Sequence, residues 1–160
     1  MSNEDLLLSA ALKSWKLSVD RADKLFSSMP ADRLQQEIAP GKNRLIYLWG
    51  HLTAVHDAML PLLDFGPRLH PEFDVPFISN ADRTQPQIPG ADEVRAAWKQ
   101  VNDKLSAEFA KLSPADWLKK HTAVSAEDFA KEPHRNRLSV LLSRTGHVAY
   151  HLGQVALAPK

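Results

Sequence analysis

Two histidines one helical turn apart carry the strongest chemical signal in this sequence. His147 and His151 stand four residues apart in a segment with helical spacing, so their side chains project about 40° apart and both can reach one metal ion. Gln154 follows on the same face, where it could orient a ligand or a bound water. No acid follows the first histidine, so the pattern is not the HExxH motif of metalloproteases. Two solvated histidines at the rim of a helix bundle would show the same spacing.

Two imidazoles are an incomplete ligand set for a divalent ion, so a third ligand must come from another helix. The candidates are His51 and His56, which are five residues apart and therefore about 140° apart around the helix axis. They cannot both face one ion. Each flanks the apolar seam of its segment, on opposite sides, and periodicity alone does not choose between them.

No residue can be assigned a catalytic role from its position in the sequence. Asp57 is the acid nearest to His51, but six residues place it about 120° away around the helix, so we expect no catalytic role for it. Tyr150 is expected to face away from the histidine pair and to pack. Three further histidines fall in expected loops, where we expect solvent to surround them: His70, His121 and His134.

The composition narrows the classes of function. The 160 residues contain no cysteine, which excludes a disulfide framework, a zinc-thiolate site, an iron–sulfur cluster and a nucleophilic cysteine. The net charge of +1 provides no attraction to the phosphates of nucleic acids. An acidic N-terminus and the lack of about 18 consecutive apolar residues predict no secretory leader and no membrane span, hence a cytoplasmic protein.

Prolines and glycines divide the chain into segments whose apolar residues recur every three or four positions, which is typical of helices. The expected helices cover about residues 4–28, 43–64, 91–112, 113–116, 125–128 and 136–157. No segment shows the alternation of a β-strand. We therefore predict an all-α fold, a four-helix bundle that forms a single domain over residues 1–160.

Two features bear on how the bundle is assembled. Residues 68–90 contain four prolines and no sustained period, and their length permits a crossover between the second and third long helices. The densest apolar stripe of the last helix lies largely away from His147 and comprises Leu138, Leu141, Leu142, Thr145 and Leu152. That helix would need cover on two faces, which predicts a pocket or a second subunit and thus a homodimer.

Two stretches of the sequence, 49–52 (WGHL) and 144–154 (RTGHVAYHLGQ), resemble the signature stretches of the DinB-like superfamily of small four-helix-bundle proteins. The likeness extends over nearly the whole chain, through the helix order, the long middle connection and the short helices before the last one. In that family, three histidines in these positions hold one divalent cation. The resemblance implies that His51, His147 and His151 are the metal ligands, and it leaves His56 out.

The resemblance also implies a metal-dependent enzyme of the thiol-transferase or hydrolase type, with Zn, Ni, Fe or Mn as its metal. A cation held by neutral imidazoles can polarise a carbonyl, acidify a water or hold a thiolate. Because the chain has no cysteine, any thiol would be a low-molecular-weight cosubstrate. One alternative is a non-catalytic, stress-related dimeric bundle that binds a metal or small ligand. Another is a purely structural bundle whose histidines have no function.

Overall fold

The computed structural model describes residues 2–159, and four long helices dominate them. The long helices are α1 (Asn3–Ser27), α3 (Leu45–Asp57), α5 (Ala91–Phe109) and α8 (Arg137–Ala156). The short elements are α2 (Ala31–Leu34), α4 (Met59–Leu62), the 3₁₀ turn η1 (Pro71–Phe73), the π-helical turn η2 (Val75–Ser79), α6 (Pro114–Trp117) and α7 (Ala126–Lys131). Between residues 2 and 159 there is no strand, and the predicted all-α four-helix bundle is confirmed.

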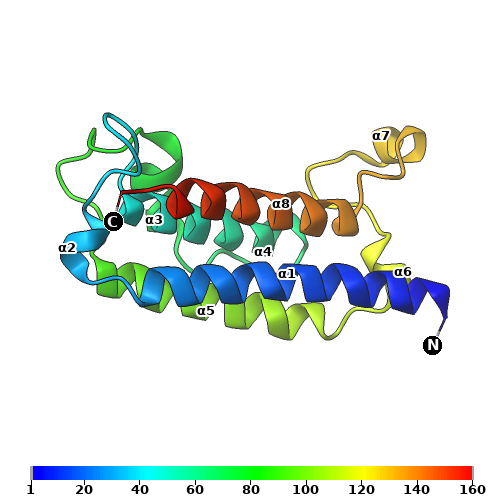
Figure 1. The fold of residues 1–160 in the computed structure, drawn as a ribbon. Coiled ribbons are helices and arrows are strands. Elements are labelled where there is room, and N and C mark those ends of the chain that lie inside the picture. Colours follow the sequence, from blue (N-terminus) through cyan, green and yellow to red (C-terminus); the bar gives the residue numbers. More distant parts are fainter. Residues whose placement is uncertain (1, 160) are drawn as a thin grey trace.

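The direction of the helices explains the long middle connection. Figure 1 shows α1 and α8 running one way along the bundle and α3 and α5 running the other way. α1 packs along α8, and α3 packs along α5. Because α3 and α5 are parallel neighbours, the chain must return along the bundle between them, so the predicted crossover is present. Within it, η1 and η2 pack against α3.

Side-chain caps set the starts of several helices where the sequence predicted them. Ser2 accepts a hydrogen bond from the Asp5 backbone N–H, and the Asp5 carboxylate accepts one from the Ser2 backbone N–H. Ser113 and Asp116 form the same reciprocal box at α6. Asn136 caps α8 by accepting a hydrogen bond from a backbone N–H in the first turn. Each cap satisfies backbone donors that have no partner inside the helix.

The second predicted helix, residues 43–64, is wrong in its extent. The structure breaks it into α3, which ends at Asp57, and the single turn α4. Pro61 accounts for the break, because its ring nitrogen cannot donate to the Asp57 carbonyl four residues earlier and its ring crowds that carbonyl. α3 is therefore 13 residues long, and α4 continues from it after Ala58, which keeps a helical backbone conformation.

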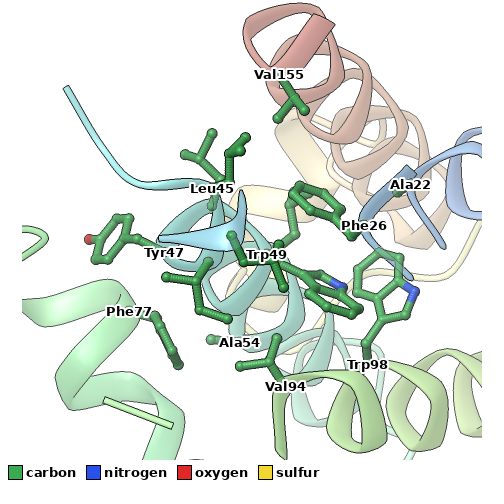
Figure 2. Close-up of a cluster of buried hydrophobic side chains, with 14 of the residues drawn as sticks. Ala22, Phe26, Leu45, Tyr47, Trp49, Ala54, Phe77, Val94, Trp98 and Val155 are labelled. Atoms are coloured by element: carbon green, nitrogen blue, oxygen red, sulfur yellow. The ribbon is translucent and has the colours of Figure 1, made fainter. Parts of the chain in front are cut away.

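The core at the start of α3 is built around Trp49, which is fully buried. Its indole stacks on the Phe26 ring of α1 with ring centroids 5.4 Å apart, and Figure 2 shows Trp98 and Val94 of α5 on the neighbouring side. Within α3 only His51 and Val55 are not buried. A helix buried on nearly every side presents no single apolar seam.

The predicted stripe on α8 is partly wrong. The residues that α8 buries are Val140, Leu141, Val148, His151 and Val155, whereas Leu142 is 51% exposed. His151 therefore belongs to the buried face, where the ring of His51 from α3 lies 5.3 Å from its own ring. Tyr150 is 63% exposed and its ring lies 5.1 Å from the His151 ring, so the expectation that it faces away from the histidine pair and packs is also wrong.

Candidate metal centre

Three histidines that are far apart in the sequence lie together between α3 and α8. The Nε2 atom of His147 lies 3.3 Å from Nε2 of His51 and 3.0 Å from Nε2 of His151. Nitrogens bound at 2.0–2.1 Å around one tetrahedral ion stand about 3.3 Å apart. These two distances match that spacing, and the three ligand atoms all lie within 4.8 Å of one another, so the cluster is compatible with metal binding.

Hydrogen bonds on the far side of two rings direct their Nε2 atoms into the cluster. His51 Nδ1 donates to the backbone carbonyl of Phe77 over 2.8 Å, and His151 Nδ1 donates to Gln154 Oε1 over 2.7 Å. Since both acceptors are oxygens without a proton, each of these neutral rings carries its proton on Nδ1 and a lone pair on Nε2. Lone pairs that converge in this way suit a cation between them, and three imidazole nitrogens suit a divalent metal.

The environment favours the neutral forms of His147 and His151 near pH 7. Burial, followed by the charges that His151 and His51 would carry, lowers the pKa of His147 to about 4. Burial also lowers the pKa of His151, against the opposing effect of its hydrogen bond to Gln154. Neutral imidazole is the form that binds metals, so both rings are in the required state.

The sequence did not predict which residues hold His51 in place. Phe77 of η2 is fully buried against α3 at Gly50, where an added Cβ would lie 2.3 Å from the Phe77 ring. Only a residue without a side chain allows this approach, which brings the Phe77 carbonyl to His51. Tyr47 adds support by stacking on the His51 ring at 6.4 Å and donating to the Asn80 carbonyl. A glycine inside an apolar helix was the available signal.

Gln154 lies where the sequence places it and contacts His151 directly. Its side-chain N–H also donates to the Tyr150 hydroxyl over 3.3 Å, which the sequence did not predict. Partners of this kind fix the orientation of a ligand ring and raise its basicity.

Replacing Gln154 with leucine should raise the dissociation constant for Zn²⁺ about tenfold, because His151 then loses its fixed orientation. Calorimetric titration of the wild type and the variant measures this. Gln154→Glu keeps an acceptor at the same place and should bind Zn²⁺ at least as well as the wild type. Unchanged affinity in Gln154→Leu would show that the amide does not support the site.

His56 lies outside the cluster, in the core between α3, α1 and α5. Its ring lies between Trp15 and Trp98, with centroids 4.7 and 5.0 Å away, and its Nδ1 donates to Asn102 Oδ1 over 2.8 Å. Full burial is the main reason why the pKa of His56 falls to about 3. Of the two candidates in this segment, the structure thus brings only His51 to the histidine pair.

The buried neutral His56 should make the protein less stable in acid. Its pKa is lower in the folded state than in the unfolded state, so the unfolded chain binds more protons below pH 6.5 and stability falls as pH falls. This contributes at most about 1.4 kcal/mol per pH unit to the free energy of unfolding. Urea unfolding at several pH values between 7 and 5 gives the free energy of unfolding as a function of pH. This free energy should fall less steeply with falling pH in His56→Gln, whose side chain keeps a donor for Asn102, than in the wild type. Parallel curves for the two proteins would refute this origin of the acid sensitivity.

Asp57 and His70 have structural contacts. Asp57 is buried and accepts hydrogen bonds from the backbone N–H groups of Leu69 and His70 while pairing with Arg68 at 3.1 Å, so it anchors the crossover. His70 is not solvated as predicted, because the crossover folds back onto α5 and brings its ring 2.9 Å from Gln100 Oε1.

The other two loop histidines differ from one another. His121 is half-buried with a buried Nδ1, so its expected solvation is also wrong. His134 is exposed, as predicted.

No helix between residues 2 and 159 has both the length and the apolar character needed to cross a membrane. The model of the DinB superfamily matches residues 15–155 of the chain. This match covers the second half of α1, all of α3 and α5, nearly all of α8 and the three clustered histidines. A search of curated proteins found no match.

Proposed function

Because the chain belongs to the DinB superfamily, we propose that it is a metal-dependent enzyme in which His51, His147 and His151 hold one divalent cation. The observation that carries the proposal is the convergence of three Nε2 atoms within hydrogen-bonding distance, two of them with Nδ1 tied to an oxygen. Imidazole ligands suit Zn, Ni and Fe, and Mn is a further candidate.

The chemistry we propose is transfer of a low-molecular-weight thiol to an electrophile, or hydrolysis. A cation bound here would supply positive charge that lowers the pKa of a thiol or a water. The protein's part is to keep His147 and His151 neutral by burial and to orient His51 and His151 through the Phe77 carbonyl and Gln154. The chain has no cysteine, so the thiol is a cosubstrate.

Two assays on the metal-loaded protein distinguish the reaction types. Turnover of chlorodinitrobenzene with glutathione or mercaptoethanol would support the thiol transferase, and turnover of nitrophenyl acetate without thiol would support the hydrolase. Both activities should disappear in His147→Ala/His151→Ala.

Tight metal binding without either activity would favour a non-catalytic protein that binds a metal or small ligand. One observation favours this second candidate. Within residues 2–159, no acidic side chain hydrogen-bonds to the three histidines, so a carboxylate general base is not in place.

We propose in addition that the protein is a homodimer that uses the outer face of α8. The face carries exposed Leu142, Tyr150 and Leu157, which are 51%, 63% and 86% exposed. Light scattering of the wild type at micromolar concentration should give twice the chain mass of 17.9 kDa. Ala149→Glu, which places a charge on the same face, should give the mass of one chain. A monomeric wild type would contradict this proposal. A cytoplasmic location stays a prediction, which cell fractionation can test.

A further inference from the structure

An arginine one turn before the first histidine of α8 has no partner for its charge. Arg144 lies on the same helical face as the buried residues Val140, Val148 and His151, because these positions are three or four residues apart. Within residues 2–159 its guanidinium forms no ion pair and no hydrogen bond. Its Nε is buried without a partner, whereas its two Nη atoms remain accessible to solvent.

Arg137, two turns earlier on the same face of α8, shows how a half-buried arginine is usually accommodated in this protein. Its guanidinium pairs with Asp64 at 3.8 Å and lies over the Phe65 ring. Arg44 and Arg68 likewise pair with the carboxylates of Asp82 and Asp57. The Nε of Arg137 is also buried without a hydrogen bond, but among these four arginines Arg144 is the one without a carboxylate partner, and it lies one turn from His147.

No acidic side chain within residues 2–159 pairs with Arg144. Burial is the one cause that lowers the pKa of Arg144, so no acidic group nearby offsets it. Its positive charge helps to lower the pKa of both His147 and His56, which places all three side chains in one electrostatic environment. His147 Nδ1 and His56 Nε2 are also buried without a partner in the described part of the chain. A desolvated cation with no counter-charge destabilises a protein, and an anion supplied from outside would offset that cost.

We propose that Arg144 binds a carboxylate of the substrate beside the metal centre. The guanidinium fork matches the two oxygens of a carboxylate, and its accessible Nη atoms face the solvent from which a ligand arrives. Arg144 precedes His147 by three residues, or about 4.5 Å along the helix, so a small molecule can span both positions. The substrate class is therefore a small carboxylate-bearing molecule. This deepens the proposed function, but binding of the carboxylate by Arg144 does not require the metal.

Acetate tests the proposal on the metal-free protein. In ¹H–¹⁵N spectra, acetate should shift the Arg144 Nε–H resonance saturably, and uncharged acetamide should not. The resonance is assigned by its absence in Arg144→Met and in Arg144→Lys. Arg137→Met is the matched control and should respond to acetate like the wild type. The proposal is wrong if acetate produces no saturable shift, or if acetamide produces the same one.

Zn²⁺-loaded protein provides the second readout. Mercaptopropionate and mercaptopropanol are thiols of the same length, and the first ends in a carboxylate where the second ends in a hydroxymethyl group. Calorimetry gives the affinity of the protein for each thiol. The preference for mercaptopropionate should fall about tenfold in Arg144→Met, which removes charged hydrogen bonds, while Zn²⁺ binding does not weaken, because a positive charge beside the centre is removed. Arg144→Lys should keep part of the preference. An equal preference in the wild type and Arg144→Met would overturn the proposal. If Zn²⁺ does not bind the wild type, the metal centre is wrong and the acetate experiment alone decides on Arg144.

Discussion

Replacing both His147 and His151 with alanine is expected to raise the dissociation constant for Zn²⁺ by at least about 1,000-fold. Structural zinc sites with four ligands bind with about 10–16 kcal/mol, or roughly 3 kcal/mol per ligand, and the variant removes two of the three nitrogens in this cluster. Each 1.4 kcal/mol is a factor of about ten in affinity, so the estimate is conservative. Calorimetry with Zn²⁺ and with Ni²⁺ measures the loss directly.

The matched control removes the same number of histidines elsewhere in the chain. His121→Ala/His134→Ala leaves the cluster between α3 and α8 intact and should bind Zn²⁺ like the wild type. Circular dichroism of both double variants establishes that each is folded. Equal Zn²⁺ affinity in His147→Ala/His151→Ala and the wild type would eliminate the proposed centre.

Gly50→Ala should destabilise the protein by about 1–3 kcal/mol, the usual cost of overpacking a core. Helix propensity alone predicts the opposite sign, since alanine is about 1 kcal/mol better than glycine inside a helix. Packing outweighs propensity here because the added Cβ would lie 2.3 Å from the Phe77 ring. That ring cannot swing aside, since Phe77 is fully buried and packs against Tyr47 and Phe73.

The same substitution should weaken metal binding, because the displaced Phe77 carries the carbonyl that holds His51. We expect the Zn²⁺ dissociation constant to rise about tenfold, as when the hydrogen-bond partner of a ligand is lost. Denaturant unfolding without metal gives the change in stability, and calorimetry gives the change in affinity.

Two other glycines are the controls for Gly50. An added Cβ at Gly146 or Gly153 meets nothing within 4 Å, so alanine at either position should stabilise α8 by about 0.5–1 kcal/mol through propensity alone. A Gly50→Ala protein that is more stable than the wild type would contradict the close contact between Phe77 and α3.

Much of the fold follows from local patterns. The starts of α1, α6 and α8 are readable because serine or asparagine caps act within three residues of the chain. The break after Asp57 was also readable, since Pro61 disrupts the helix four residues earlier whatever the tertiary context. Periodicity predicted the helix through this proline because its apolar residues keep their spacing on both sides of the break.

The sequence did not predict correctly which side chains of α8 are buried, because neighbouring helices decide this. Leu142 was expected in the core of the bundle and Tyr150 was expected to pack, yet both are exposed. The rotation of α8 about its own axis depends on how it packs along α1 and over α3, and small residues such as Gly146 and Ala149 make its apolar stripe difficult to locate.

The candidate centre combines both kinds of information. The sequence alone determines that His147, His151 and Gln154 share a face, because residues three and four apart on a helix are neighbours in any fold. It does not determine which histidine of α3 joins them. That choice depends on distances between residues about a hundred positions apart, and α3 is buried on nearly all sides, so no polar face marks the one that turns toward α8. The packing of η2 on Gly50, the role of the Phe77 carbonyl and the unpaired charge of Arg144 likewise exist only once the helices are assembled, since each is a relation between separate elements.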